Sequence, residues 1–423
     1  MEESANREIQ LAGASINNGE LIIEIREMFK RPEIQASPQC RIQKVPYHIR
    51  KWNEEACTPQ FISIGPFHRE NKRLKSMEEH KERYFKSFIQ RSRINLEDVV
   101  STIRELEESI RGCYLETIEL KSDEFVKMIL VDACFILELF IRSSSESSTS
   151  DDPIILKPMS ITIMHDLLLL ENQLPFFVIE KLYHLAIPSL TNHQALIDLT
   201  SSYFALYKIP DHSNVEIKHF TDLLRTFRLP PLKKLPKRDS ELIPLLYSAT
   251  HLHEAGVKFE VGSSESFLDI KFEKGVLKIP CIILDYWMEI VYRNVMALEQ
   301  TYYLKNGYIT DYFWLLDSLI NTEKDVDLLC ENKVMINFLG DNDAVKSMIN
   351  NLNYGIYPEN RRSDYNDLCE NLNRFCRNPC HSWKATLKSQ YFSNPWRTVA
   401  TIAAIILLLL TLLQTICTII QIV

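Results

Sequence analysis

The sequence predicts a mainly helical protein: a helical domain with a small inserted antiparallel β-meander at about 257–284, and a single transmembrane helix at the C-terminus. Three observations lead to this prediction. Apolar residues recur at helical spacing through most of the 423 residues. They alternate with polar residues, as in strands, only around 257–284. The last stretch, 399–423, contains no Asp, Glu, Lys or Arg.

Composition narrows the class of protein further. With 46% hydrophobic and 25% charged residues, the chain is globular rather than disordered. Only 10 residues are Gly, and none belongs to a Gly-rich loop followed by Lys-Ser or Lys-Thr, so a P-loop nucleotide site is excluded. The formal net charge of −8 and the lack of a recognisable module argue against nucleic acid as a partner.

The first half of the chain is predicted to be an extension followed by helices. Residues 1–39 form a weakly structured extension, in which 21–29 has the spacing of a short amphipathic helix with Leu21, Ile22 and Ile25 on one side. Order begins near Cys40, and a turn-rich stretch precedes the first long helix. The expected helices cover 77–91, 96–114 and 122–141, and a polar loop, a candidate for phosphorylation, follows at 143–152.

A strongly apolar stretch at 161–185 is interrupted by residues that would be costly in lipid, so it is not a second span. The interrupting residues are His165, Asp166, Glu171, Asn172 and Gln173. We expect one helix to end near Glu171 and another to carry Pro175 in its first turn. Strands at 257–261, 266–272 and 276–284 are followed by helices at 285–304, 308–320, 324–338, 341–352 and 364–391.

The C-terminal stretch is long enough to cross a bilayer, because the residues from Val399 to Val423 would span about 37 Å as a helix. The residues expected at the membrane interface are Tyr391, Phe392, Trp396 and Arg397. Basic residues precede the span and no charge follows it, which favours a cytosolic N-terminal part. No signal peptide begins the chain, so we expect a tail anchor (396–423) behind a cytosolic domain (40–395), with the plasma membrane favoured over endomembranes.

Polar residues within the anchor recur on one helical face: Thr411, Gln414, Thr418 and Gln421. Such residues hydrogen-bond between packed membrane helices, so this face is a candidate contact for a homo-oligomer. Modest polarity tolerated near a membrane exit is an equally weighted alternative.

Two polar clusters in apolar surroundings are candidate sites. One is Glu171, Asn172 and Gln173, and the other is Arg293, Asn294, Glu299 and Gln300. Buried polar groups must be hydrogen-bonded, and no nucleophile accompanies these clusters, so we expect a structural network rather than a catalytic site. No catalytic motif is found, and the cysteines near His381 lack zinc-site spacing. We therefore expect no enzyme activity, no cofactor and no metal.

A run of basic residues forms a third candidate: His68, Arg69, Lys72, Arg73 and Lys75. It could meet anionic headgroups or an acidic partner, although a solvated face is the commoner explanation of such a run.

Several ordered motifs resemble the plant "domain of unknown function 247" family. They lie at 40–46 (CRIQKVP), 59–68 (PQFISIGPFH), 77–81 (MEEHK), 166–177 (DLLLLENQLPFF), 254–259 (EAGVKF), 267–272 (FLDIKF), 293–300 (RNVMALEQ) and 391–396 (YFSNPW). The resemblance runs from about residue 40 to the end. It implies a plant protein, a single-pass membrane form and no known enzymatic activity. Some grass relatives are associated with pollen–stigma self-incompatibility, which suggests recognition or signalling.

We therefore expect a membrane-tethered, non-enzymatic recognition, signalling or scaffold protein whose cytosolic domain binds other proteins, with the lipid bilayer contacted through 399–423. Two alternatives stay open: a membrane-tethered enzyme of unrecognised type that uses a pocket near one of the polar clusters, and an outward-facing recognition protein with the opposite topology.

Overall fold

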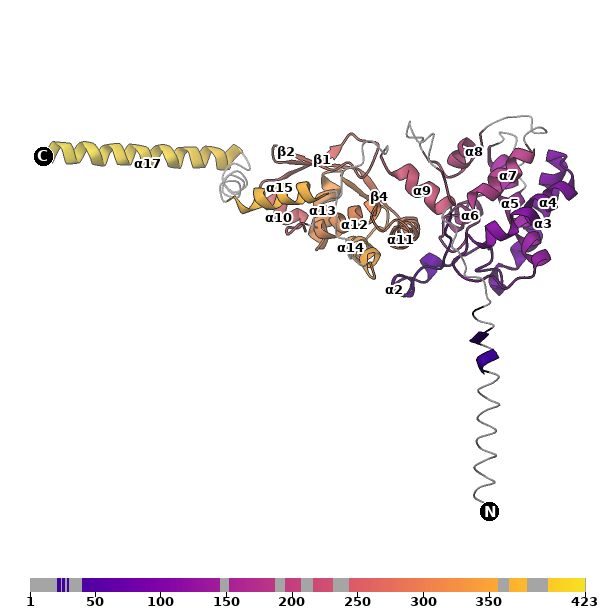
Figure 1. The fold of residues 1–423 in the computed structure, drawn as a ribbon. Coiled ribbons are helices and arrows are strands. Elements are labelled where there is room, and N and C mark those ends of the chain that lie inside the picture. Colours follow the sequence, from indigo (N-terminus) through magenta and orange to yellow (C-terminus); the bar gives the residue numbers. More distant parts are fainter. Residues whose placement is uncertain are drawn as a thin grey trace, which may run out of the picture.

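The computed structural model describes residues 21–23, 25–26, 29, 40–144, 152–186, 195–206, 216–230, 243–356, 365–378 and 395–422. It is mainly helical, as the sequence predicts, and its described core elements form two lobes that meet at α9 and α11 (Figure 1). One apolar core cluster runs through both lobes, from Cys40 to Leu372.

The first lobe is organised around one buried helix. This helix, α5 (Ser122–Ser144), is buried from Phe125 to Phe140 except at Lys127, and it packs against α3, α4, α7 and α8. The other elements of this lobe are α2 (Tyr47–Arg50), η1 (Glu55–Cys57), η2 (Lys72–Leu74), α3 (Ser76–Ser92), α4 (Leu96–Arg111), α6 (Met159–Asp166), α7 (Phe176–Ala186), α8 (Leu196–Tyr203) and α9 (Phe220–Arg228).

The second lobe surrounds α11 (Tyr286–Thr301), which begins at the N-cap Asp285 and also contacts η1, α9 and α6 of the first lobe. The lobe's other helices are α10 (Ala249–Glu254), α12 (Tyr308–Leu319), α13 (Glu323–Glu331), α14 (Asn342–Asn353) and α15 (Asn366–Arg377). Its strands are β1 (Lys258–Gly262), β2 (Lys271–Glu273), β3 (Val276–Pro280), β4 (Ile282–Leu284) and β5 (Met335–Asn337).

The strands do not form the predicted antiparallel meander. Only β2 and β3 make an antiparallel hairpin, through the tight turn at Lys274 and Gly275, both with positive φ. β1 pairs with β3 in parallel, so the order is β1-β3-β2. The prediction was wrong because the segment between β1 and β2 is no tight turn: Phe267 packs edge-on against Tyr312, with ring centroids 4.7 Å apart. The loop between β1 and β2 therefore crosses over β3, which places β3 between β1 and β2 in the sheet.

A second small sheet was also missed. β4 leaves the first sheet and pairs in parallel with β5, with Ile283 opposite Ile336. The helix predicted at 324–338 instead ends at Glu331, because Lys333 takes a positive φ of 58° and breaks the helix. The helix before Glu171 ends earlier than predicted, at Asp166. The loop at 145–151 and the chain after Asn378, up to α17, lie outside the described residues.

The C-terminal helix α17 (Pro395–Ile422) confirms the apolar terminal helix. Among the described residues it is the one helix long and apolar enough to cross a membrane, and none of its Val399–Ile416 stretch is buried against protein.

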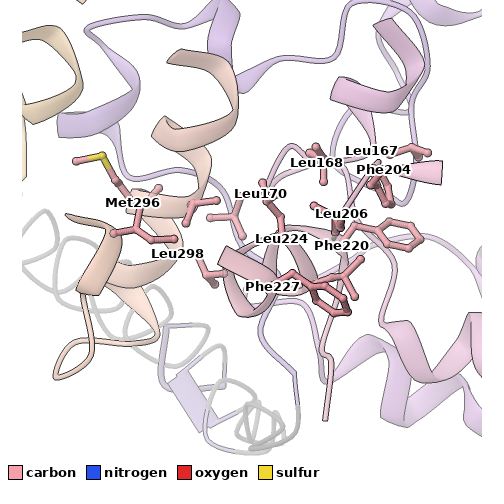
Figure 2. Close-up of a cluster of buried hydrophobic side chains, with 14 of the residues drawn as sticks. Leu167, Leu168, Leu170, Phe204, Leu206, Phe220, Leu224, Phe227, Met296 and Leu298 are labelled. Carbon is pink, nitrogen blue, oxygen red and sulfur yellow. The ribbon is translucent and has the colours of Figure 1, made fainter. Parts of the chain in front are cut away.

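The two lobes also share apolar packing. Figure 2 shows Leu168 and Leu170, from the loop after α6, gathered with Leu224 of α9 and Met296 and Leu298 of α11 in one cluster. Leu168 and Leu170 of this cluster lie in the same α6–α7 loop as the polar residues described next.

Candidate functional site

The loop between α6 and α7 is fastened by side chains of its own motif. Asn172 accepts a hydrogen bond from the Ile64 amide (2.7 Å) and donates to the Ile62 carbonyl (3.0 Å). Gln173 donates to the carbonyl of Leu167 (2.6 Å) and accepts from the amide of Phe220 (2.8 Å). Both side chains are fully buried. They therefore replace the backbone pairing that a helix would have supplied across this break.

Asp166, at the end of α6, fastens the turn-rich stretch that precedes α3. Its carboxylate accepts the amides of Gln60 (2.9 Å), Phe61 (2.7 Å) and Ile62 (2.8 Å). Burial raises the pKa of Asp166 to about 6, even though these three donors favour the charged form.

Glu171 ties the loop to the beginning of the ordered domain. Its carboxylate accepts the Val45 amide (2.8 Å), two bonds from Arg50 Nη1 (2.5 and 2.6 Å), and pairs with His68 Nε2 (3.1 Å). Burial alone would raise the pKa of Glu171, but the hydrogen bonds from His68 and Arg50 outweigh burial and lower it. Glu171 is therefore a carboxylate saturated with donors.

The second predicted cluster lies on α11, and Asn294 joins it to the first. Asn294 Oδ1 accepts the Leu170 amide (2.9 Å), and its Nδ2 donates to the carbonyls of Ala56 and Ile290 (both 2.7 Å). One amide side chain thus connects both clusters and both lobes.

Glu299 makes a similar connection at the far end of α11. It accepts Arg225 Nε of α9 (2.9 Å) and both the amide and the hydroxyl of Thr310 (2.8 Å each). Gln300 is half-buried and makes no side-chain hydrogen bond within the described residues.

Arg293 is the largest fully buried side chain of the described residues. Its Nη2 donates to Glu289 Oε1 (2.8 Å) and to the Asn351 carbonyl (2.9 Å). Glu289 also accepts Asn53 Nδ2 of the first lobe (2.9 Å). Within the described part of the chain, Nε and Nη1 of Arg293 have no hydrogen-bond partner.

We call these inter-lobe hydrogen bonds the seam: Asn294 to Leu170 and Ala56, Glu299 to Arg225, and Glu289 to Asn53. The nearby Cys57 thiol is buried, and burial followed by the Glu171 charge raises its pKa to about 12. It is therefore not an activated nucleophile at neutral pH. The polar clusters and the seam are therefore suited to holding the α6–α7 loop, the start of the ordered domain and α11 together by hydrogen bonds.

Sequence reasoning missed several partners of the network, namely Arg50, Asp166 and Arg225. It also missed the buried pair of Lys81 and Asp132, whose Nζ–Oδ1 distance is 2.6 Å. Asp132 Oδ2 accepts the Gly65 amide as well (2.8 Å). The sequence does contain a sign of this pair, because Asp132 is a charged residue within the apolar run of α5, and a buried charge normally has a partner.

The predicted basic run is divided by the structure. His68 turns inward to Glu171, whereas Lys72, Arg73 and Lys75 are exposed and Arg69 is half-buried. These four other residues make no ion pair within the described residues.

Part of the predicted membrane region can be placed. Trp396 is exposed, and Thr411 Oγ1 donates to the Leu407 carbonyl of its own helix (2.7 Å). Gln414 is exposed on α17. Outside the described residues or side chains lie Tyr391, Phe392, Arg397, Thr418, Gln421 and Val423. No group of three or more potential metal ligands occurs among the residues described.

Comparison of the sequence with known proteins identifies similar proteins in plants. The profile of DUF247, a plant protein of unknown function, matches residues 42–410. The UPF0481 protein At3g47200 of Arabidopsis thaliana is 30% identical over 407 residues, covering 88% of this chain and 84% of the relative. The putative UPF0481 protein At3g02645 of the same plant is 23% identical over 469 residues, covering 86% and 87%. No solved structure matches the chain.

The matched region contains the whole of both lobes, the seam and most of the Val399–Ile416 stretch, and it confirms the resemblance carried by the ordered motifs. This chain belongs to the plant DUF247 family of proteins of unknown function.

Proposed function

We propose that this protein is anchored by α17 in a membrane, the plasma membrane rather than an endomembrane, with its helical body in the cytosol. We further propose that the body acts without catalysis, by binding other proteins in recognition, signalling or scaffolding. Lys384, Lys388 and Arg397 precede the apolar stretch of the helix, which supports this orientation.

The observation that carries protein binding is an apolar face on the second small sheet. We call it the β4–β5 face, and its residues are Cys281, Ile283, Ile336 and Phe338. Ile283 is 52%, Ile336 40% and Phe338 69% exposed. Ile283 and Ile336 are register partners, and the Phe338 amide bonds the Leu284 carbonyl, so the exposed side chains adjoin. A sheet face that meets water normally carries polar residues, and contiguous exposed apolar side chains mark interaction sites.

The polar network supports a non-catalytic role. Its carboxylates accept bonds from amides, Arg50, Arg225 and His68, and the raised pKa of the nearby Cys57 keeps that thiol protonated at neutral pH. A catalytic carboxylate would need a free oxygen directed at a substrate.

Proximity labelling in plant cells tests the binding role. We expect Phe338→Asp to remove a specific set of labelled proteins, because a charge on this face prevents apolar burial. Leu304→Asp is the matched control, since Leu304 is also a largely exposed apolar side chain (59%, against 69% for Phe338) but lies outside the face. Equal label sets from wild type and both variants would contradict the proposal.

Protease treatment of sealed microsomes tests the orientation. Complete digestion of the N-terminal part from the cytosolic side supports it, and protection of that part refutes it.

The anchor is also proposed to associate with a second copy through the face of Thr411, Gln414, Thr418 and Gln421. Replacing Gln414 and Gln421 with Leu should weaken self-association in a membrane two-hybrid assay, by about 1 kcal/mol. An unchanged signal would count against this contact.

A further inference from the structure

Two buried cysteines lie side by side where the chain enters the ordered domain. Cys40 is the first residue of the described range 40–144, and Cys113 follows the end of α4. Both are thiols of the apolar core, with 2% and 1% of their surface exposed. Their side chains are hydrogen-bonded to each other. Two thiols in contact are the precursor of a disulfide.

The backbone brings the two thiols together. The Ile42 amide donates to the Cys113 carbonyl (2.7 Å), and the Leu115 amide donates to the Ile42 carbonyl (3.0 Å). These two bonds make the parallel bridge between Ile42 and Tyr114. Cys40 therefore lies two residues from a fixed backbone contact with Cys113. A disulfide needs Cα atoms about 4.4–6.8 Å apart, which is the scale of the spacing between paired backbone segments.

Each thiol is also held by a carbonyl group. Cys113 Sγ donates to the Ser109 carbonyl of α4 (3.3 Å), and Cys40 Sγ donates to the Lys218 carbonyl (3.5 Å). The Lys218 carbonyl in turn accepts the Phe176 amide (2.7 Å) at the start of α7. The thiol pair therefore lies where the first residues of the domain meet the end of α4 and the segment that leads into α9.

We propose that Cys40 and Cys113 form an intramolecular disulfide when the protein meets an oxidising glutathione buffer. The bond joins the start of the ordered domain to the end of α4 and closes a loop of roughly 70 residues. The inference does not rest on the proposed function, because the pair includes no residue of the β4–β5 face or of α17.

The oxidant is a low-molecular-weight disulfide, oxidised glutathione. One thiolate of the pair attacks it, forms a mixed disulfide and releases one reduced glutathione. The second thiolate then attacks the cysteine sulfur of the mixed disulfide and releases the other reduced glutathione. One S–S bond forms in the protein and one breaks in glutathione. The two thiol protons and the two electrons that the protein loses are those that the two reduced glutathione molecules gain.

Burial makes this reaction slow in the closed domain. The hydrogen bond with Cys113, followed by burial, raises the pKa of the Cys40 thiol. Little thiolate is therefore present at neutral pH, and glutathione reaches the pair only when residues 40–46 open locally. The pair responds to its compartment, because the cytosolic glutathione pool keeps such thiols reduced and an exported domain would be oxidised.

Oxidation of the purified full-length protein in detergent tests the pair. The protein is incubated with oxidised and reduced glutathione a few degrees below its Tm, so that local segments open and reclose many times. Remaining thiols are alkylated, and the disulfides are mapped by mass spectrometry of the linked peptides. We expect the Cys40–Cys113 peptide to be about tenfold more abundant than any other linked peptide, because the fold already holds these two sulfurs together.

Two serine variants serve as controls. Cys40→Ser should abolish the linked peptide, whereas Cys57→Ser, which removes a similarly buried thiol, should leave it unchanged. Oxidation should raise the Tm of wild type and of Cys57→Ser by about 5 °C, because a cross-link restricts the unfolded chain. The Tm of Cys40→Ser should not respond to oxidation.

Recovery of both cysteines as alkylated thiols after this incubation would overturn the inference, and so would mixed linkages with no preference for this pair. A linked form that melts below the reduced protein would also overturn it, since the bond would then distort the fold. None of these results affects the labelling experiment with Phe338→Asp, so the proposed function stands or fails separately.

Discussion

Removing the Glu171 carboxylate should destabilise the fold through the groups that it leaves behind. Glu171→Ala strips the Val45 amide of its acceptor, and a buried unsatisfied amide costs about 1–3 kcal/mol. It also leaves Arg50 and His68 without their anion. Arg50 keeps Thr58 as an acceptor (2.8 Å) and its side chain is 21% exposed, so it can rehydrate and adds about 1 kcal/mol. We therefore expect a loss of about 3 kcal/mol, at the low end for a broken buried pair.

Thermal unfolding of the detergent-solubilised chain measures this loss. A body of this size has an entropy of unfolding of about 0.7 kcal/mol/K, so 3 kcal/mol corresponds to a Tm lowered by about 4 °C. Glu54→Ala is the matched control, because Glu54 pairs with the same Arg50 but its side chain is 76% exposed. An exposed pair contributes well under 1 kcal/mol, so this variant should melt within about 1 °C of wild type.

The pH dependence provides a second check on the same residue. The pKa of Glu171 is lowered in the folded state, so its contribution is present above the unfolded value of about 4.3. It is lost as the pH falls through the lower folded-state pKa. The difference between wild type and Glu171→Ala should therefore shrink below about pH 4. If the two alanine variants melt at the same temperature at pH 7.5, burial of this carboxylate does not matter and the reasoning fails.

Three further variants test other parts of the fold by thermal unfolding. Asn294→Ala should cost about 2–3 kcal/mol and speed amide exchange in both lobes, because it leaves the Leu170 amide unpaired, whereas Gln300→Ala should cost under about 0.5 kcal/mol. Gly65→Ala should cost about 3 kcal/mol or more, since its Cβ would lie 2.7 Å from the Gln173 carbonyl oxygen at φ +71°; Gly340→Ala, with φ +83° and open space, should cost only about 1–2 kcal/mol. Burial raises the pKa of Asp317 to about 6, so its ionisation opposes folding as the pH rises from about 4 to 6; Asp317→Asn should raise stability at pH 7.5 by about 1 kcal/mol, allowing for partial exposure, and the gain should vanish near pH 4.

The sequence is sufficient to predict features that depend on local spacing. The apolar pattern located α5, which is buried on nearly every side, and α11, which buries a continuous stretch from Arg293 to Glu299, and an uncharged terminal stretch identified α17. The polar insert after Asp166 was recognisable because Glu, Asn and Gln in an apolar run must be either bonded or functional. These signals are contained within a single segment of chain.

Features that depend on pairing between distant segments could not be predicted. The parallel pairing of β1 with β3 needs a connection that crosses β3, and in that connection Phe267 packs on Tyr312 of α12, a contact that no local pattern encodes. Nothing in the spacing shows that Asn294 reaches Leu170, 124 residues away. The inward turn of His68 depends likewise on Glu171, a residue that arrives from another part of the chain.

The seam explains why α11 carries polar residues where apolar packing would suffice. Glu289, Asn294 and Glu299 are spaced five apart, and each bonds a different segment of the first lobe. The apolar cluster of Figure 2 supplies association energy but tolerates small displacements. Hydrogen bonds do not: a slide of α11 past the first lobe by one turn, about 5.4 Å, would break the bonds that these three side chains make to Asn53, Ala56, Leu170 and Arg225. The polar residues therefore specify the register of the two lobes, and the apolar residues hold them together.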